Sequence, residues 1–444
     1  MKNFIQKVSS LWTHSSPQSE KKAYCFTHIP KTAGTSFIVL LDRFFKQADI
    51  FPKQLWREIG HIEKEDNENF ELFRGHFGGG GVSSLTDRSL SHLTLLRDPF
   101  ALSLSTFQFV QREKNTLVHA LVSQEGFGLE DFLTNSKTYP LVNNRMVRNL
   151  SFDFKEDPSA QEVFLSAETI ECLKPLLADA AQALTPEQRF ERAKTYIDGS
   201  IWFGLVEQFD KSMELLCHHF KRPSLGRSQR LNTKPQTLEV SDKAQRRIEI
   251  LNAWDIKLYK YATQVFEKRY QNMLHDLESF RIHSSQNTHD LLDKQYQKNQ
   301  PYPEICHGQL TFDQKLTGSQ WHRRELLEED GSFFRWTGPE PNSSIDLWVK
   351  PSDCQLQMRV INATSPEDLD EMKLSVNGHA VDWYSDDEGV VRILAANVPK
   401  THIKPNGLAR VELKMPRVES HKAAFGSDDE RLVGVAVHWL KFMA

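Results

Sequence analysis

The chain has 444 residues, more than the roughly 250 to 300 at which a single hydrophobic core stops growing, so we expect two domains. Hydrophobic residues at 39% and charged residues at 26% exclude a disordered or membrane-embedded protein. The formal net charge of -4 is nearly neutral for this length and argues against broad nucleic-acid binding. Any anionic ligand would have to be bound by a local basic patch.

The cysteines and the N-terminus indicate a cytoplasmic protein. The cysteines are scattered and form no CxxC pair, so we expect reduced thiols and neither disulfides nor a metal site. Residues 1–22 form a polar arm without the apolar run of about 7 to 15 residues that a signal peptide needs, and no later run is long enough to span a membrane. The cysteines are Cys25, Cys172, Cys217, Cys306 and Cys354.

Residues 23–280 are predicted to form an α/β domain with a central parallel sheet. Short apolar runs alternate with helical periodicity, the pattern of strands joined by crossover helices. Two or three helices are expected between Asp153 and Arg192, either over a substrate cleft or as a structural addition. The last helix should run from Ser241 to Phe280. The strand candidates are Tyr24–His28, Leu93–Leu96 and Ile201–Val206, and the inserted helices include Glu162–Leu165 and Ile170–Leu184.

A polar linker is expected over residues 281–303, and residues 304–444 are predicted to form an antiparallel β-sandwich or jelly roll. The linker is rich in Gln and Asn and ends in two prolines. After it, short alternating runs are separated by turn signals such as Asn377-Gly378 and Asn406-Gly407. The strand candidates are Ser344–Val349, Gln355–Ile361, Lys373–Val376, Val390–Leu394, Ala409–Leu413 and Val433–Trp439.

The segment YCFTHIPKTAGTSF, Tyr24 to Phe37, combines a strand, a turn with one glycine and a helix start. Unpaired N–H groups at a helix start bind anions, Gly34 permits a close approach, and Lys31 adds positive charge. A Walker A loop would need GxxxxGK[ST], so an ordinary nucleoside-triphosphatase is excluded. The segment is either an anion site or a capped turn.

The segment LTLLRDPFALSLSTF, Leu93 to Phe107, again joins a strand to a helix. A guanidinium fork at Arg97 and the hydroxyl of Ser105 are the donors that a phosphate monoester requires. Taken alone, Asp98 would cap the helix and Arg97 could form a surface ion pair.

Between these segments lies LFRGHFGGGG, Leu72 to Gly81, whose four consecutive glycines we expect to exclude a regular element. His76 is the candidate general base, because a neutral imidazole can take a proton from a hydroxyl near neutral pH. Alternatively, His76 only hydrogen-bonds the turn.

Together these motifs resemble those of sulfotransferases that use 3′-phosphoadenosine 5′-phosphosulfate (PAPS). HIPKTAGTSF is similar to the version in carbohydrate enzymes typified by heparan sulfate 2-O-sulfotransferase. The resemblance implies that Lys31 contacts the leaving-group oxygen, that Arg97 and Ser105 bind the 3′-phosphate, and that His76 is the base. Arg74 stands where the family pattern has a first histidine. By the same resemblance the 5′-phosphate loop comprises Lys31, Thr32, Ala33, Gly34, Thr35 and Ser36.

Weaker signals surround these motifs. Each could belong to a binding site, or could be a structural feature, either exposed to solvent or packed in the core. They are a polar cluster resembling an acceptor-side segment (Asn143, Asn144, Arg145, Arg148), Glu207 after the third strand, a basic stretch that would close over the nucleotide (Lys221–Arg230 with Arg227, then Lys234), and a sugar-stacking platform (Trp321, His322, Glu325, Arg335, Trp336).

We therefore predict a P-loop-like three-layer α/β sulfotransferase domain followed by a β-sandwich that is a candidate carbohydrate-binding module. The enzyme would transfer a sulfuryl group from PAPS to a hydroxyl of a saccharide or glycolipid without a metal ion, as a bacterial member of the family. No nucleic acid or integral membrane segment is expected. The alternatives are a kinase-like phosphoryl transferase, for which Asp98 is the candidate magnesium ligand, and a catalytically idle glycan-binding protein.

Overall fold

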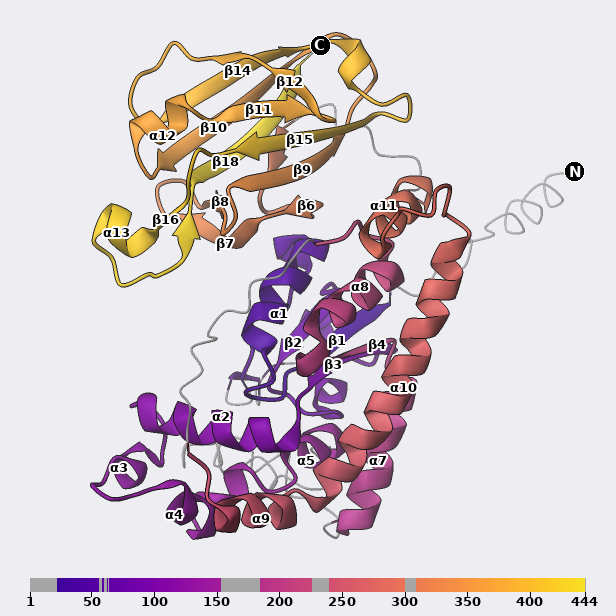
Figure 1. Cartoon of the computed structure of the whole chain (residues 1–444), viewed down its shortest axis with the longest axis vertical. Helices are drawn as coiled ribbons and strands as arrows, with labels where there is room; N and C mark the ends of the chain where they lie inside the picture. Colours follow the sequence, from indigo (N-terminus) through magenta and orange to yellow (C-terminus); the bar gives the residue numbers. More distant parts are fainter. Residues whose placement is uncertain are drawn as a thin grey trace, which may run out of the picture.

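The computed structural model describes residues 22–55, 58–59, 62, 64–152, 184–225, 239–299 and 309–443. Figure 1 shows an α/β part, which we call the first domain, and above it a part built mainly of antiparallel strands, the C-terminal domain. The helices expected at Glu162–Leu165 and Ile170–Leu184 lie outside the described residues, as does nearly all of the predicted N-terminal arm.

The first domain is centred on a four-stranded parallel sheet in the order β2-β1-β3-β4. The three expected strands are present, and β2 is a fourth strand that was not among the predicted ones. It pairs with β1 from Tyr24 opposite Leu72 to Thr27 opposite Gly75. This strand ends before the glycine run begins, so the glycines do not interrupt it. With four residues it is too short for its sequence to show the alternation that predicts a strand. The strands are β1 (Ala23–Thr27), β2 (Leu72–Gly75), β3 (Leu90–Leu96) and β4 (Trp202–Leu205).

Helices pack around this sheet, and α2 begins with an ordinary side-chain cap. Asp98 accepts a hydrogen bond from the Ala101 N–H at the start of α2, with Pro99 as the first helical residue. On α1, Phe37 stacks on Trp202 of β4 with ring centroids 4.7 Å apart, which fixes α1 against the sheet. The helices are α1 (Gly34–Leu41), α2 (Pro99–Arg112), α3 (His119–Val122), α4 (Leu129–Thr134), α5 (Arg145–Ser151), α7 (Pro186–Gly199), α8 (Phe209–Phe220), α9 (Asp242–Leu251), α10 (Ala253–Glu278) and α11 (Thr288–Asn299).

The single helix expected from Ser241 to Phe280 is wrong, because the chain breaks into α9 and α10 at Asn252. The Asn252 side-chain amide donates to the carbonyl of Ile248 at 3.0 Å and thereby ends α9. The next helix, α10, then runs the length of the first domain (Figure 1). A side-chain hydrogen bond of this kind competes with the helical ladder, which periodicity alone does not reveal.

The region expected to be a linker contains a helix, α11, whose inner face is buried. Leu291 and Leu292 belong to the core of the first domain, and Tyr296 is buried against Trp348 of the C-terminal domain, although the segment is mostly polar. The segment has so few apolar residues that its composition did not indicate a buried helix.

The C-terminal domain contains two antiparallel sheets that share one hydrophobic core. One has seven strands in the order β13-β14-β10-β18-β8-β7 with β5 beside β18, and the other has five in the order β12-β11-β15-β9-β6. The Asn377-Gly378 turn joins β11 to β12, with positive φ at both residues. The strands are β5 (Gln309–Thr311), β6 (Gly318–Ser319), β7 (Trp321–Leu327), β8 (Ser332–Thr337), β9 (Asn342–Trp348), β10 (Cys354–Ala363), β11 (Lys373–Val376), β12 (His379–Val381), β13 (Trp383–Tyr384), β14 (Arg392–Val398), β15 (Leu408–Lys414) and β18 (Val435–Met443).

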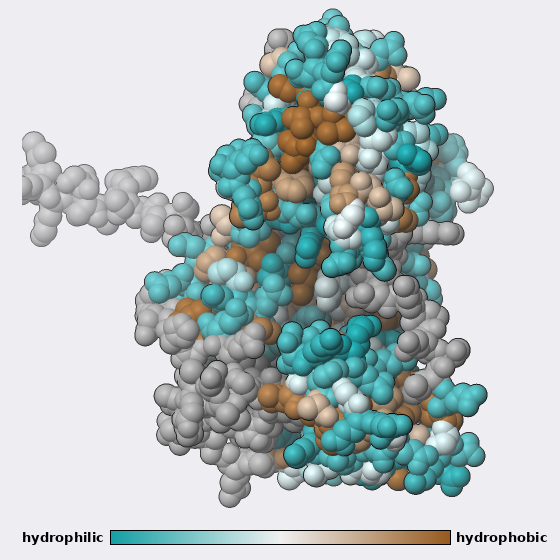
Figure 2. All heavy atoms as spheres, turned by 90° about the vertical axis from the view of Figure 1, so that its left-hand side faces the viewer, coloured by the Kyte–Doolittle hydropathy of each residue, from teal (hydrophilic) through white to brown (hydrophobic). Residues whose placement is uncertain are grey.

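The surface is mostly hydrophilic on the face shown in Figure 2, with a compact hydrophobic patch on the C-terminal domain near the top. Within the described ranges, no helix is both long and apolar enough to cross a membrane. Cys25, Cys217 and Cys354 are free thiols.

Candidate functional site

The turn between β1 and α1 has an unusual backbone. Lys31 and Ala33 both adopt positive φ, at 71° and 59°, which costs a residue with a Cβ atom about 1 kcal/mol or more. Thr32 is fully buried, and its hydroxyl donates to the Ile29 carbonyl at 2.8 Å to close the turn. Strained residues of this kind concentrate at ligand sites.

The start of α1 is open to an anion. No side chain in the described part of the chain caps this helix, so its first N–H groups retain their hydrogen-bonding capacity. Thr35 is exposed there, whereas Ser36 is buried. A Cβ atom at Gly34 would lie 2.0 Å from the His28 ring, so only glycine allows this histidine to pack against the helix start.

Lys31 lies among other cations. Its ammonium sits 4.2 Å above the Phe109 ring of α2, on the helix face that also carries Ser105 and Arg112 at helical spacing. Partial burial, followed by repulsion from Arg112, Arg145 and Arg97, lowers the pKa of Lys31 to about 8. An anion bound here would reverse that shift because it would offset the repulsion.

Arg97 and Asp98 follow β3 as the motif predicted. The Arg97 guanidinium donates to the Lys31 carbonyl at 2.9 Å, which ties the end of β3 to the turn after β1. Asp98 is the cap of α2, as expected from the tripeptide taken alone. Ser105 is half-buried two turns further along α2.

His76 has the tautomer that a base requires. Its Nδ1 lies 2.8 Å from the carbonyl oxygen of His28, and because a carbonyl only accepts, Nδ1 carries the proton. The other ring nitrogen, Nε2, is therefore the one that can take a proton. Burial lowers the pKa of His76 to about 4, so the ring is neutral at pH 7.

A second histidine does accompany His76, although it comes from an unexpected place. The rings of His28 and His76 stack with centroids 4.2 Å apart. Arg74, at the position of the family's first histidine, points elsewhere and forms a two-pronged ion pair with Asp42 at 2.6 and 2.9 Å. The sequence reasoning missed His28, although its position directly after β1 placed it at the ligand edge of the sheet.

Arg145, one of the weaker candidates from the polar cluster of the sequence, lies beside the site. It is 3% exposed and donates to the Thr106 hydroxyl at 3.0 Å, and its charge lowers the pKa of both Lys31 and His76.

Arg145 is held in place because the starts of α5 and α10 cap each other. Asn144 Oδ1 accepts from the backbone N–H of Asp255, whose carboxylate accepts from the Met146 and Val147 N–H groups. Asn144 is thus structural.

The remaining weaker candidates have structural roles. The glycine run lets the chain pass against α5, because a Cβ atom at Gly79 would lie 2.1 Å from the Leu150 carbonyl. Glu207 accepts a hydrogen bond from Tyr259 at 2.6 Å. In the basic stretch, Arg222 donates to Thr317 of the C-terminal domain, and residues 226–238, including Arg227 and Lys234, lie outside the described residues.

Of the two alternatives for Trp321 and Trp336, a carbohydrate platform or buried tryptophans, the structure supports the second. The two indoles are 1% and 2% exposed, so neither offers a face to a sugar. Trp321 donates to the Ser344 carbonyl at 2.7 Å, and Glu325 pairs with Arg431 at 2.7 Å. The two tryptophans are therefore core residues, because their side chains point into the domain, and Glu325 belongs to a structural ion pair.

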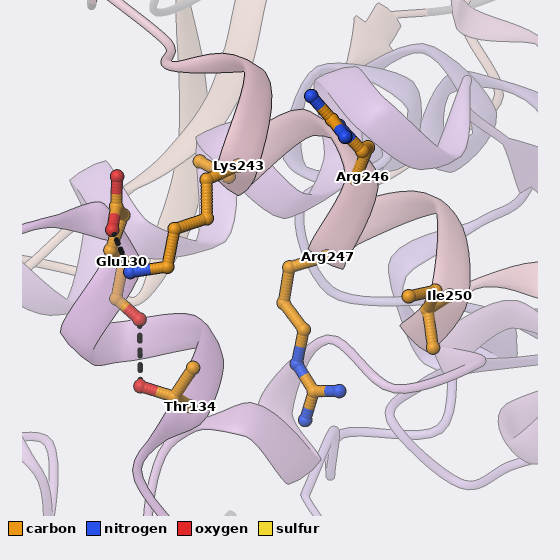
Figure 3. Close-up of a pocket in the computed structure, with 7 residues that line it drawn as sticks. Glu130, Thr134, Lys243, Arg246, Arg247 and Ile250 are labelled. Carbon is orange, nitrogen blue, oxygen red and sulfur yellow. Dashed lines mark hydrogen bonds and ion pairs between the residues drawn. The ribbon is translucent and has the colours of Figure 1, made fainter.

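A separate pocket of about 390 Å³ lies between α4 and α9 and contains none of the predicted site residues (Figure 3). Lys243 crosses it to Glu130 at 2.7 Å, and Thr134 donates to the Glu130 carbonyl at 2.9 Å. Within the described ranges, no group of three or more His, Cys, Asp or Glu side chains is placed to hold a metal ion.

Comparison with known proteins finds heparan-sulfate sulfotransferases among the relatives of this chain. Heparan-sulfate 6-O-sulfotransferase 2 of Danio rerio is 28% identical over 203 residues, 41% of this chain and 40% of that protein. Heparan-sulfate 6-O-sulfotransferase 1 of Homo sapiens is 28% identical over 288 residues, 55% of this chain and 66% of that protein. No family model matches the chain.

Both relatives are named as heparan-sulfate sulfotransferases, which supports a sulfotransferase family for this chain. The matched region spans less than two thirds of each relative's length. The motif resemblance pointed to a 2-O enzyme, whereas both relatives are named as 6-O enzymes.

Proposed function

We propose that this chain is a PAPS-dependent sulfotransferase that acts on a hydroxyl of a saccharide or glycolipid. The observation that carries the proposal is the meeting of two features at one edge of the sheet. The uncapped start of α1 beside Lys31 suits a phosphosulfate group, and His76 follows the adjacent strand with Nε2 ready to accept a proton.

Each residue then has a defined task. Lys31 and the N–H groups of residues 32–36 bind the 5′-phosphosulfate and stabilise the negative charge that develops on the leaving oxygen. Arg97 and Ser105 hold the 3′-phosphate and so orient the donor. His76 Nε2 takes the proton of the acceptor hydroxyl while the new S–O bond forms and the bond to the 5′-phosphate oxygen breaks.

The finer assignments belong to the same proposal. We propose a P-loop-like catalytic domain over residues 23–280, a connection over 281–303 and a β-sandwich accessory domain over 304–444, in a cytoplasmic, bacterial protein. The acceptor position is 2-O by the motif likeness or 6-O by the names of the relatives. Sulfating a heparosan oligosaccharide and mapping the product by mass spectrometry discriminates the two.

Thermal stability with adenosine 3′,5′-bisphosphate, AMP and ATP with magnesium tests the proposal. A ligand at about 100 times its Kd adds about 2.7 kcal/mol to stability. Stabilisation by the 3′-phosphorylated nucleotide alone is the expected result.

Stabilisation by ATP with magnesium would instead establish the kinase alternative. Against that alternative, its candidate magnesium ligand, Asp98, is engaged as the cap of α2. If no nucleotide stabilises the protein but a glycan does, the idle glycan-binding alternative holds.

A further inference from the structure

Four arginines meet where the two domains join. Arg43 follows α1 and Arg74 lies on β2, whereas Arg324 and Arg335 face each other across the β7–β8 ladder. Arg43, Arg74 and Arg335 are 4%, 8% and 1% exposed, and Arg324 is half-buried, so most of this group is enclosed. We call these four side chains the junction cluster.

Most of the partners of the junction cluster are neutral. Arg43 donates to the Trp321 carbonyl, and Arg335 donates to the His322 carbonyl at 2.5 Å. Arg324 donates across the junction to the Asp42 carbonyl at 2.6 Å. Of the four, Arg74 alone has a carboxylate partner within the described ranges, and that partner is Asp42.

The junction cluster therefore holds excess positive charge. Four guanidinium groups face two carboxylates, those of Asp42 and Asp313, while His322 is neutral because burial lowers its pKa to about 4. An enclosed charge without a counter-charge costs several kcal/mol.

Several nitrogens of the cluster also lack a hydrogen-bond partner. Among the described residues, nothing accepts from the following buried atoms: Arg43 Nε, Arg74 Nη1, Arg324 Nε, Arg335 Nε and Arg335 Nη2. Buried donors in folded proteins are nearly always satisfied, by water or an ion where the chain offers no acceptor. A water molecule would satisfy a donor but leave the excess charge, whereas an anion corrects both.

We propose that the junction cluster binds a small tetrahedral oxyanion, inorganic sulfate or phosphate, between the two domains. A dianion matches the two surplus charges, and its oxygens suit the paired donors of guanidinium groups. The unpaired nitrogens are shielded from solvent, which favours a free ion over a group carried on a polymer.

The position of the cluster gives the ion a consequence for the nucleotide site. Asp42 directly follows α1, whose other end is the anion-binding start of the helix. The Arg74 partner of Asp42 lies on β2, two residues before His76. An ion here would hold both elements and the C-terminal domain in one arrangement.

Equilibrium dialysis of the full chain against radiolabelled sulfate tests this site directly. A Lys31→Met background removes competition from the start of α1, and chloride keeps the ionic strength constant. We expect one saturable sulfate per chain, displaced by inorganic phosphate. Arg335→Met should weaken binding at least 10-fold, and the control Arg417→Met, whose side chain is 62% exposed, should leave it unchanged.

Absence of saturable sulfate in the Lys31→Met protein would overturn the site, as would equal binding by the Arg335→Met and Arg417→Met variants. Should Arg335→Met not fold, Arg335→Lys keeps the charge but removes the planar fork, and the same 10-fold criterion applies. The assay requires neither nucleotide nor turnover. A failure of the proposed enzymatic function would therefore not affect this test.

Discussion

Two basic clusters lie at opposite ends of α1, a helix of eight residues that is about 12 Å long. At its start, Lys31, Arg97 and Arg145 surround an uncapped helix end with a partly exposed lysine. At its other end, the junction cluster is enclosed and consists of arginines bonded to backbone carbonyls and to Asp42.

The difference shows that the degree of burial decides whether a lysine or an arginine suits a basic site. A lysine near solvent can lose or regain its proton as a ligand leaves or arrives. The lowered pKa of Lys31 makes this change of protonation possible near neutral pH. An arginine stays charged when enclosed, which suits a permanent structural ion. The first cluster is thus suited to a ligand that exchanges, and the second to one that stays.

The largest expected effect is at the base beside the first cluster. His76→Ala should lower kcat by about 10² to 10⁴, because it removes the group that takes the acceptor proton. Affinity for adenosine 3′,5′-bisphosphate should stay within about 2-fold, as measured by calorimetry. His275→Ala, on an exposed position of α10, is the control. Unchanged turnover in His76→Ala would remove the base assignment.

Removing the carboxylate of the second cluster should have the next largest effect. Asp42→Asn removes the carboxylate bonded to Arg74, the one bonded counter-charge of the cluster among the described residues, and should lower the free energy of unfolding by about 3 to 5 kcal/mol in urea denaturation. Added sulfate should restore part of that loss. The surface pair partner Asp87, 82% exposed, is the comparison, and Asp87→Asn should cost less than about 1 kcal/mol. Equal losses would show that the cluster is ordinary surface.

Lys31→Met should weaken binding of adenosine 3′,5′-bisphosphate by roughly 10- to 100-fold, the loss of one charged hydrogen bond. Because the pKa of Lys31 is about 8 and an anion raises it, binding at pH 9 should take up a proton. Calorimetry in two buffers of different ionisation enthalpy measures this uptake, which Lys31→Met should abolish. The exposed neighbour Lys114→Met should retain it.

The last prediction concerns the acid stability of the first domain. Since burial lowers the pKa of His76 from 6.5 to about 4, the unfolded chain binds a proton in this window and the native chain does not. Stability should therefore fall as pH falls from 6.5 to 4, by at most about 1.4 kcal/mol per pH unit from this group. His76→Gln should flatten the slope in urea denaturation, and an unchanged slope would contradict the shift.

Local sequence revealed the parts of the site that local chemistry governs. The strand, turn and helix around Lys31, the helix cap at Asp98 and the strand before Arg97 follow from residues a few positions apart, and the structure has them. The strand β2 and helix α11 were not predicted, because each depends on partners distant in the sequence. The break at Asn252 was not predicted because a local side-chain hydrogen bond, to the Ile248 carbonyl, leaves no trace in the periodicity.

The amino-acid sequence by itself determined the α/β order, the change to antiparallel strands and the three motifs. Periodicity, capping and turn preferences depend only on residues a few positions apart. The tertiary structure alone decided which side chains meet. It paired His28 with His76, brought Arg145 to Lys31, buried Trp321 and Trp336, and gathered Arg43, Arg74, Arg324 and Arg335 at one junction. Contacts between residues separated by tens to hundreds of positions depend on how sheets and helices pack, and no local pattern records them.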